Sequence, residues 1–196
     1  MTSASLTAQP VRLSDGRVVL RDWRPADIPA YRQWLRPEHE WHRTNGPYYG
    51  SPSEAEADRL ATGQGTVAAT DPAERPRPRR SLVVADPGSD ALLGVASWYW
   101  ESQETDWRRM GLVLYDPACW GRGLGTSALR LWTGYLFEQT DTRRLDFATY
   151  SGNHGMLAIG RKLGFVEEGR FRKARPWQGV DHDSVVYGVL REEWVQ

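Results

Sequence analysis

Three glycines at alternate positions, set between an aliphatic stretch and a strongly periodic segment, constrain this chain more than any other feature. The run reads Trp120-Gly121-Arg122-Gly123-Leu124-Gly125-Thr126 and follows the aliphatic residues 110–114. Glycines let backbone N–H groups approach a ligand closely, and the first turn of a helix carries partial positive charge. The run therefore predicts a loop that holds a phosphate or pyrophosphate at a helix N-terminus.

Length and composition limit the class of protein. With 196 residues, 40% hydrophobic side chains and ten tryptophans, we expect a flexible tail over residues 1–10 and one domain over residues 11–196. The formal net charge of zero argues against a general nucleic-acid or acidic-membrane binder. A single cysteine, Cys119, fits a reducing cytosol, and no apolar run is long enough to span a membrane. We therefore expect a cytoplasmic protein without a nucleic-acid or membrane partner.

Apolar periodicity and turn signals predict the element order β-β-α-α-β-β-β-α-β-α-β-β. A hairpin is expected over residues 11–23, and the polar connection 103–106 makes strands 91–101 and 107–115 antiparallel neighbours. The helix after the glycine run, residues 123–139, then links two strands by a crossover. This pattern is typical of an α+β fold with a mostly antiparallel sheet.

Two segments before the glycine run are predicted from capping and composition. Ser53-x-x-Glu56 resembles a capping box that starts the second helix, and Gly63 and Gly65 are expected to end it. Residues 70–80, rich in proline and arginine, are expected to form a mobile loop with solvated charges.

Other interpretations of the glycine run are weaker. Gly123-x-Gly125-x-x-Ala128 satisfies the dinucleotide fingerprint, but residues 116–120 separate the strand from the glycine run, and the incoming strand belongs to an antiparallel meander. The Walker pattern fails because no Gly-Lys-Ser/Thr is present. A glycine turn before a packing helix, with no ligand, is the remaining alternative.

The motifs taken together resemble the GNAT family of N-acetyltransferases, and within it the ribosomal-protein-alanine acetyltransferase-like branch. The resemblance extends from about Val11 to Trp194 and rests on motifs in a fixed order. These are Asp116-Pro117, Trp120 to Thr126, Asn153, Lys162-Leu163-Gly164-Phe165, Glu168-Gly169, Asp183, Tyr187 and Glu193-Trp194. It implies the GNAT acyl-CoA N-acyltransferase fold, with a central sheet of about six or seven strands flanked by about four helices.

The resemblance implies acetyl-CoA as co-substrate and no metal. The residues expected to contact it are Val113, Leu114, Tyr115, Trp120, Gly121, Arg122, Gly123, Leu124, Gly125, Thr126 and Asn153. The amides of residues 122–126 would bind the pyrophosphate. The pantetheine would pair like an extra strand with residues 113–115. Asn153 would contact the cofactor arm, cap a helix, or do both.

The implied reaction is direct attack of a primary amine, of a small molecule or a protein N-terminus, on the thioester. Many relatives supply the proton for the leaving thiolate from a tyrosine four residues before the glycine of the Gly-Phe pair, where this chain has Gly160. Met156 stands where the branch often has serine. Glu101 is the first candidate for the base; Glu104, Asp106, His39 and His42 are its rivals.

Several choices stay open at this point. Trp41, Tyr48 and Tyr49 either close over the substrate or pack over the sheet edge. The strip Arg170, Arg172, Lys173 and Arg175 either attracts an acidic acceptor or the CoA 3'-phosphate, or forms a solvated strand edge. A catalytically idle acyl-CoA-binding sensor or scaffold is the alternative to an enzyme, and a homodimer is left open.

Overall fold

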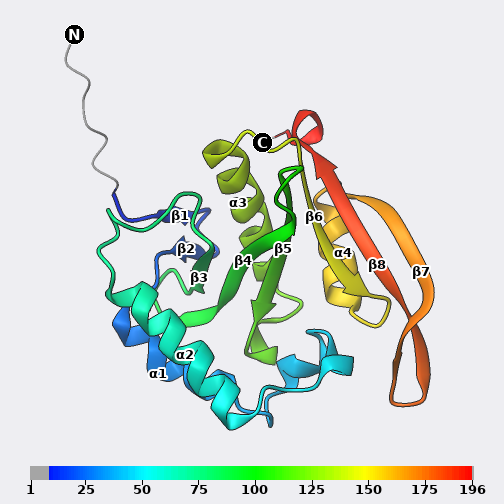
Figure 1. Ribbon diagram of the computed structural model, residues 1–196, viewed down its shortest axis with the longest axis horizontal. Coiled ribbons are helices and arrows are strands. Elements are labelled where there is room, and N and C mark those ends of the chain that lie inside the picture. Colours follow the sequence, from blue (N-terminus) through cyan, green and yellow to red (C-terminus); the bar gives the residue numbers. More distant parts are fainter. Residues whose placement is uncertain (1–8, 196) are drawn as a thin grey trace.

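The computed structural model describes residues 9–195, and the predicted tail over residues 1–10 lies mostly outside this range. A central sheet of eight strands carries helices on both faces (Figure 1). The strands are β1 (Arg12–Ser14), β2 (Val19–Arg21), β3 (Ser81–Ala85), β4 (Leu92–Ser102), β5 (Trp107–Leu114), β6 (Arg144–Tyr150), β7 (Val166–Trp177) and β8 (Val180–Leu190). The α-helices are α1 (Ile28–Trp34), α2 (Glu54–Ala69), α3 (Leu124–Gln139) and α4 (His154–Lys162), and short 3-10 turns include η2 (Glu40–Arg43) and η3 (Pro47–Tyr49).

The sheet order is β1-β2-β3-β4-β5-β6-β8-β7, and all neighbours are antiparallel except β5 and β6. The predicted element order is confirmed, including the antiparallel pair β4 and β5 and the helix-linked crossover from β5 through α3 to β6. The expected six or seven strands become eight, because the N-terminal hairpin joins the same sheet through β2 and β3.

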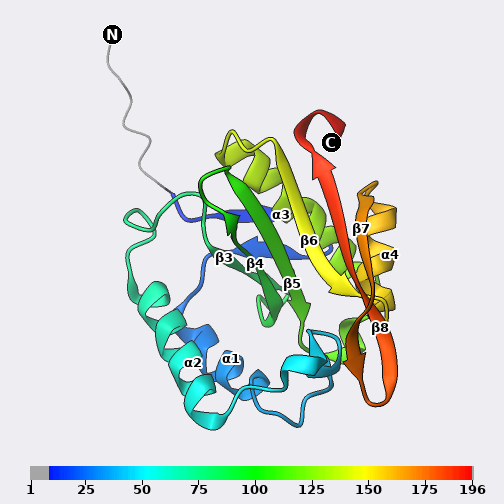
Figure 2. The same cartoon turned by 45° about the vertical axis from the view of Figure 1, so that its right-hand side comes forward.

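Each face of the sheet has its own core. Helices α3 and α4 cover one face with Leu129, Trp132 and Leu157, and α1 and α2 cover the other with Tyr31 and Ala61 (Figures 1 and 2). Apolar burial contributes about 25 cal/mol per Å2 of surface removed from water, so both layers stabilise the strands they cover. The strands between them therefore form a rigid frame on which loops at one sheet edge are positioned.

The prediction that Gly63 and Gly65 end the second helix is wrong. Ser53 does cap α2, since its hydroxyl accepts from the Glu56 amide at 3.4 Å, but the helix continues to Ala69. A Cβ at either glycine would meet nothing within 4 Å, so both occupy an open face. Packing of the opposite alanine face outweighs a propensity cost of about 1 kcal/mol per glycine.

The prediction that the charges of residues 70–80 are solvated is wrong for two arginines. Arg79 donates from Nε to Asp22 Oδ1 at 2.7 Å, and only 3% of the Arg79 surface is exposed. Arg75 is also buried and donates to the carbonyls of Trp23, Ala68 and Thr70. Through Asp22 and Trp23, which are 57 and 52 residues away from Arg79 and Arg75, these arginines hold the segment between α2 and β3 against the chain that follows β2.

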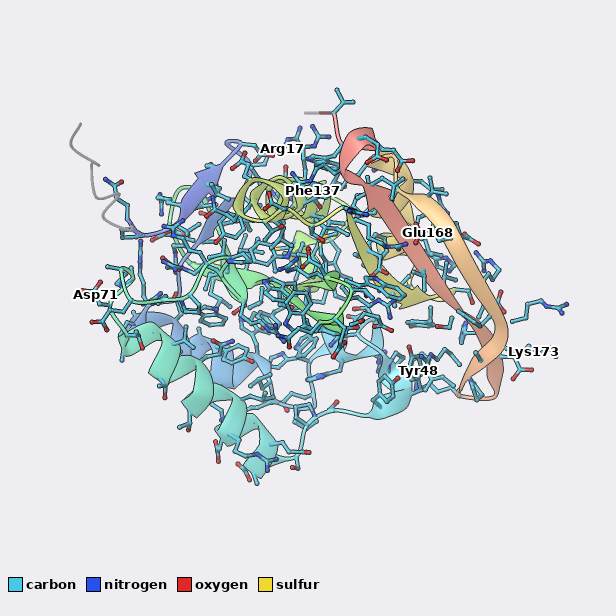
Figure 3. All side chains as sticks on the ribbon, turned by 45° about the horizontal axis from the view of Figure 1, so that its top comes forward. Arg17, Tyr48, Asp71, Phe137, Glu168 and Lys173 are labelled. Carbon is cyan, nitrogen blue, oxygen red and sulfur yellow. The ribbon has the colours of Figure 1, made fainter. Side chains whose placement is uncertain are left out.

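The last two strands are longer than predicted. The sequence predicts strands over residues 165–174 and 184–190, whereas β7 extends to Trp177 and β8 begins at Val180. β7 is the edge strand of the sheet, and a register shift between Phe171 and Arg175 interrupts its pairing with β8. In Figure 3 the Lys173 side chain extends away from this hairpin into solvent, while Tyr48 lies beside it. No helix within residues 9–195 has the length and apolar character to cross a membrane.

Candidate functional site

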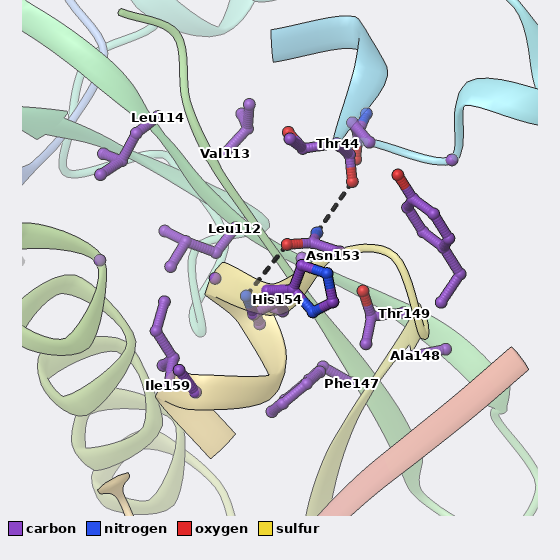
Figure 4. Close-up of a pocket in the computed structure, with 18 of the residues that line it drawn as sticks. Thr44, Leu112, Val113, Leu114, Phe147, Ala148, Thr149, Asn153, His154 and Ile159 are labelled. Atoms are coloured by element: carbon purple, nitrogen blue, oxygen red, sulfur yellow. Dashed lines mark hydrogen bonds between the residues drawn. The ribbon is translucent and has the colours of Figure 1, made fainter. Parts of the chain in front are cut away.

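A cavity of about 770 Å3 opens where β5 and β6 separate. Its walls come from the turn after η2, from β5, from the glycine run, from the end of β6 and from α4 (Figure 4). This volume is in the range of small-molecule and cofactor sites. The cavity therefore joins elements that are distant in sequence, and the predicted glycine run forms one part of it.

The separation of the two parallel strands begins at a buried ion pair. β5 and β6 pair only at Arg108 with Leu145 and at Arg109 with Asp146. Arg109 donates from Nε to Asp146 Oδ1 at 2.8 Å, and Asp146 has no exposed surface. Burial opposes the charge of Arg109, but the bond and attraction to Asp146 outweigh it and raise the Arg109 pKa. Beyond this pair, the β6-facing edge of β5 has no strand partner among the described residues.

Strand alternation shows which backbone groups face the gap. The Tyr115 amide donates to the Leu93 carbonyl of the β4 side at 2.9 Å. In an antiparallel pair, successive residues point their N–H and C=O groups to opposite edges. The backbone groups of Leu112 and Leu114 therefore face the gap. The Leu114 carbonyl already accepts the Trp120 indole N–H at 2.9 Å.

The structure places most, but not all, of the expected β5 and loop residues at the cavity. Those that line it are Val113, Leu114, Trp120, Gly121, Gly123, Gly125, Thr126 and Asn153. Arg122 and Leu124 do not line it. Tyr115 is 2% exposed and packs among Tyr31, Trp34 and Trp41, so its ring belongs to the core.

The glycine run has the backbone geometry that its sequence predicts. Gly121 and Gly123 have φ values of 69° and 83°, a region that side chains other than glycine rarely adopt. Gly123 precedes α3, and its carbonyl accepts from Ser127 at 3.0 Å. Within residues 9–195, no protein acceptor bonds the amides of residues 121–126. A set of free amides at a helix N-terminus is suited to an anionic group.

Asn153 has one of the two roles considered from the sequence, that of a helix cap, and its contact with a cofactor stays a prediction. Its Oδ1 accepts from the Met156 amide at 3.0 Å and so caps α4. Its Nδ2 donates to the Thr44 carbonyl at 2.8 Å, and Figure 4 shows both bonds beside the cavity. The side chain thus joins the start of α4 to the turn that follows η2.

Gly160 leaves no space for the tyrosine of many relatives. A Cβ at this position would lie 2.9 Å from Phe147 and 3.0 Å from Tyr187. The two rings stack with a centroid separation of 5.6 Å. A larger residue on α4 would therefore displace aromatic rings of β6 and β8.

The candidate bases lie outside the cavity lining. Glu101 pairs with Arg109 at 2.7 Å. Because Arg109 is the last residue of β5 that pairs with β6, Glu101 lies close to the point where the two strands separate. Nε2 of His39 and Nε2 of His42 lie 3.0 Å and 2.9 Å from backbone carbonyls. Those nitrogens carry the protons in these bonds, so Nδ1 is the nitrogen of each ring that could accept a proton. Glu104 contacts Ser102, and Asp106 pairs with Arg108.

Trp41 packs in the core, whereas Tyr48 and Tyr49 lie at the cavity. Trp41 is buried and its indole donates to the Trp34 carbonyl at 2.7 Å, so it is a core residue. Tyr48 and Tyr49 line the cavity, together with Arg175 of β7. Sequence reasoning missed the other lining residues of this region, which are Thr44, Tyr99, Leu112, Thr149, Tyr150, His154 and Ser184. Their positions depend on how β4, β6 and β8 end, and no local pattern marks them.

A family model described as an acetyltransferase (GNAT) domain matches residues 17–166, about three quarters of the chain. The chain belongs to the GNAT family. The resemblance seen in the glycine run, Asn153 and the Gly164-Phe165 pair is therefore confirmed at the level of the family and its fold.

Named relatives extend the comparison of this GNAT protein. It is 35% identical over 74 residues to the Bacillus subtilis (strain 168) protein named "Putative ribosomal N-acetyltransferase YdaF", a match that covers 38% of this chain and 40% of that one. The chain thus matches less than half the length of this relative. A solved GNAT acetyltransferase from Bacillus anthracis has a TM-score of 0.72 at 17% identity, covering 93% of this chain and all of that one.

A second solved structure, the ribosomal-protein-S5-alanine acetyltransferase from Vibrio fischeri, has a TM-score of 0.70 at 17% identity. The match covers 95% of this chain and 100% of the Vibrio fischeri chain. At such identities the two structures establish the fold of the GNAT chain and no more.

Proposed function

We propose that this GNAT chain is an acetyl-CoA-dependent N-acetyltransferase that acts on a primary amine of a small molecule or a protein N-terminus. The observation that carries the proposal is the row of free amides at residues 121–126, which adjoins a cavity along the unpaired edge of β5. The name of the Bacillus subtilis relative, a putative ribosomal N-acetyltransferase, supports a protein acceptor.

The residues present fit coenzyme A along its length. The amides of residues 121–126, reinforced by the α3 dipole, are suited to the pyrophosphate. The backbone groups of Leu112 and Leu114 face the gap between β5 and β6 and are suited to the amide groups of the pantetheine. Arg17 adds positive charge here, since its Nη1 lies 3.2 Å from the position of a Cβ on Gly123.

The chemistry requires two proton movements that this chain must assist. When bound, acetyl-CoA supplies an activated acyl group as a thioester. The acceptor amine loses a proton as the amide forms, and the thiol of coenzyme A gains one as it leaves. Glu101, beside Arg109, is the proposed base, acting through water. Burial raises the pKa values of the cavity-lining phenols Tyr48, Tyr99 and Tyr150, so each keeps a proton at neutral pH to supply.

A binding and turnover experiment tests the proposal. Melting temperature is measured with saturating acetyl-CoA or NAD(H), and release of the free CoA thiol is followed across a panel of primary amines and N-terminal peptides. We expect stabilisation by acetyl-CoA alone, and thiol release with at least one amine accompanied by an acetylated product. Stabilisation by acetyl-CoA without turnover on any amine would favour the idle sensor or scaffold instead. No stabilisation by acetyl-CoA would overturn the proposal.

A further inference from the structure

We propose that the acceptor of this site is a primary amine that also carries a carboxylate, and that Arg175 binds that carboxylate. The inference rests on the proposed function and names the chemical class of its substrate. It follows from the charges around the cavity and from the surroundings of one guanidinium group.

The cavity wall has positive charges and no negative ones among the described residues. The charged side chains that line it are Arg109, Lys162 and Arg175, and no Asp or Glu is part of the lining. An amine acceptor with several positive charges would lack a counter-charge here. An acceptor with a negative group beside its amine would find a complementary surface.

Of the three cationic side chains that line the cavity, one is already paired with carboxylates and one lies far from the tyrosines. Arg109 is neutralised by Asp146 and Glu101, at 2.8 Å and 2.7 Å. Lys162 lies at the last turn of α4, about 12 Å along the helix from His154 at its start. It also lines a second, smaller cavity with Leu163 and Trp194. Arg175 is therefore the cation that remains for a ligand near the tyrosines.

Arg175 has no carboxylate partner within residues 9–195, although its hairpin carries two aspartates. Asp181 pairs with Lys173 at 3.2 Å, and Asp183 pairs with Arg170 at 3.0 Å. The Nε of Arg175 is buried and bonds no acceptor. A buried donor without a partner costs free energy, which a bound acceptor atom would recover.

Two tyrosine rings lie close to the Arg175 guanidinium. The Arg175 Cζ lies 4.8 Å from the Tyr48 ring centroid and 5.7 Å from that of Tyr49. Stacking on aromatic faces leaves the edge of a guanidinium free for a planar, bidentate carboxylate. Tyr48 is partly buried and Tyr49 is 76% exposed, so the Tyr48 side of the guanidinium is the one shielded from water.

Arg175 lies far from the glycine run. β7 lies three strands from β5 in the order β5-β6-β8-β7, a span of roughly 14 Å at the usual strand spacing. The free amides of residues 121–126 follow β5, whereas Arg175 packs on the turn η3. An anion at Arg175 would thus be a group of the acceptor and not the pyrophosphate.

The experiment compares matched acceptors that differ in one charge. Thiol release is measured with amino acids and their amides (glycine and glycinamide, aspartate and asparagine), with N-terminal dipeptides Ala-Glu and Ala-Gln as C-terminal amides, and with spermidine. We expect the wild-type kcat/KM to be at least about tenfold higher for the acidic member of at least one pair, the effect of one charge-assisted bond. R175Q should bring this ratio close to one by lowering kcat/KM for the acidic member, and should leave acetyl-CoA affinity unchanged.

A control and a second readout keep the outcomes distinct. R172Q removes an equal charge from the same hairpin outside the cavity lining, and should keep the preference. Calorimetric titration of Ala-Glu amide into the protein saturated with CoA measures acceptor binding without turnover; R175Q should weaken it at least about tenfold. This inference alone is overturned if turnover or binding favours neutral amines or spermidine. It is also overturned if R175Q changes neither the preference for acidic acceptors nor their binding. Absence of turnover on every amine overturns the proposed function, and the calorimetric comparison then decides whether Arg175 binds carboxylates.

Discussion

Nδ2 of Asn153 donates to the carbonyl of Thr44 at 2.8 Å, and this bond ties the first turn of α4 to the segment that carries Tyr48 and Tyr49. The same side chain caps α4 through Oδ1. One residue thus couples the stability of a helix to the position of a loop at the far wall of the cavity, and the two roles can be separated by substitution.

Replacing Asn153 should have different effects with different side chains. Asn153→Ala removes both bonds and should lower the free energy of unfolding by about 1–2 kcal/mol, the usual range for a lost cap. Asn153→Ser retains a cap acceptor and should recover most of that loss in urea unfolding. Because serine is too short to reach Thr44, both variants should raise the KM for the acceptor. Equal stability of the two variants would contradict the capping role.

The glycine run should tolerate no side chain at its left-handed position. Gly123→Ala meets a φ of 83° and the nearby Arg17 guanidinium, and should weaken acetyl-CoA binding at least about tenfold by moving free amides. Gly164→Ala is the matched control, because Gly164 has a φ of 77° with nothing within 4 Å of a Cβ. It should lose a similar free energy of unfolding, about 1 kcal/mol, and bind acetyl-CoA normally. Calorimetry and urea unfolding measure the two quantities.

The ion pair between Arg79 and Asp22 should contribute strongly to stability. Arg79→Ala leaves the buried Asp22 carboxylate without its main partner and should cost about 3–5 kcal/mol of unfolding free energy. Arg77→Ala, two residues away, removes an exposed arginine and should change stability by about 0–1 kcal/mol. Chemical denaturation of both variants checks the difference. Similar losses would show that residues 70–80 are held by something other than this pair.

Glu101 should affect turnover more than binding if it acts as the base. Glu101→Gln keeps the size of the side chain and removes the carboxylate that pairs with Arg109. We expect kcat to fall about a hundredfold, within the usual effect of a general base, with the KM for acetyl-CoA unchanged. Glu104→Gln, on the connection after β4, should behave as wild type. An unchanged kcat in Glu101→Gln would remove this residue from the mechanism.

The single cysteine reports on the cavity. Cys119 lines it and is 8% exposed, and burial raises the pKa of its thiol. Because the thiolate is the reactive form, alkylation by iodoacetamide at pH 8 should be slower than in unfolded protein and should accelerate as the pH rises. Acetyl-CoA should slow it further. Mass spectrometry gives the rates, and equal labelling with and without acetyl-CoA would place the ligand elsewhere.

Local patterns predicted the elements that depend on local causes. The glycine run, the cap at Ser53 and the order of strands and helices follow from periodicity and turn chemistry, and the structure contains them. The end of α2 was predicted wrongly because glycines at 63 and 65 lie on an open face, and packing of the other face decides whether the helix continues.

The burial of Arg79 and the orientation of Arg175 were beyond such patterns. The partner of Arg79 is 57 residues away in sequence, so composition alone suggested a solvated loop. In a regular strand Lys173 and Arg175 would share the face opposite to that of Arg170 and Arg172. A register shift and a φ of 58° at Lys173 break that alternation. Only the folded hairpin brings Arg175 onto Tyr48.

The stacked rings of Phe147 and Tyr187 against Gly160 restrict how this chain can change over time. A tyrosine introduced on α4 by one codon change would meet two aromatic neighbours and be purged for instability before any catalytic benefit appeared. Acquiring it requires smaller residues on β6 and β8 first, and those intermediates would each carry a void in the core. Lineages with and without that tyrosine are thus separated by a barrier in sequence space and not by a single step.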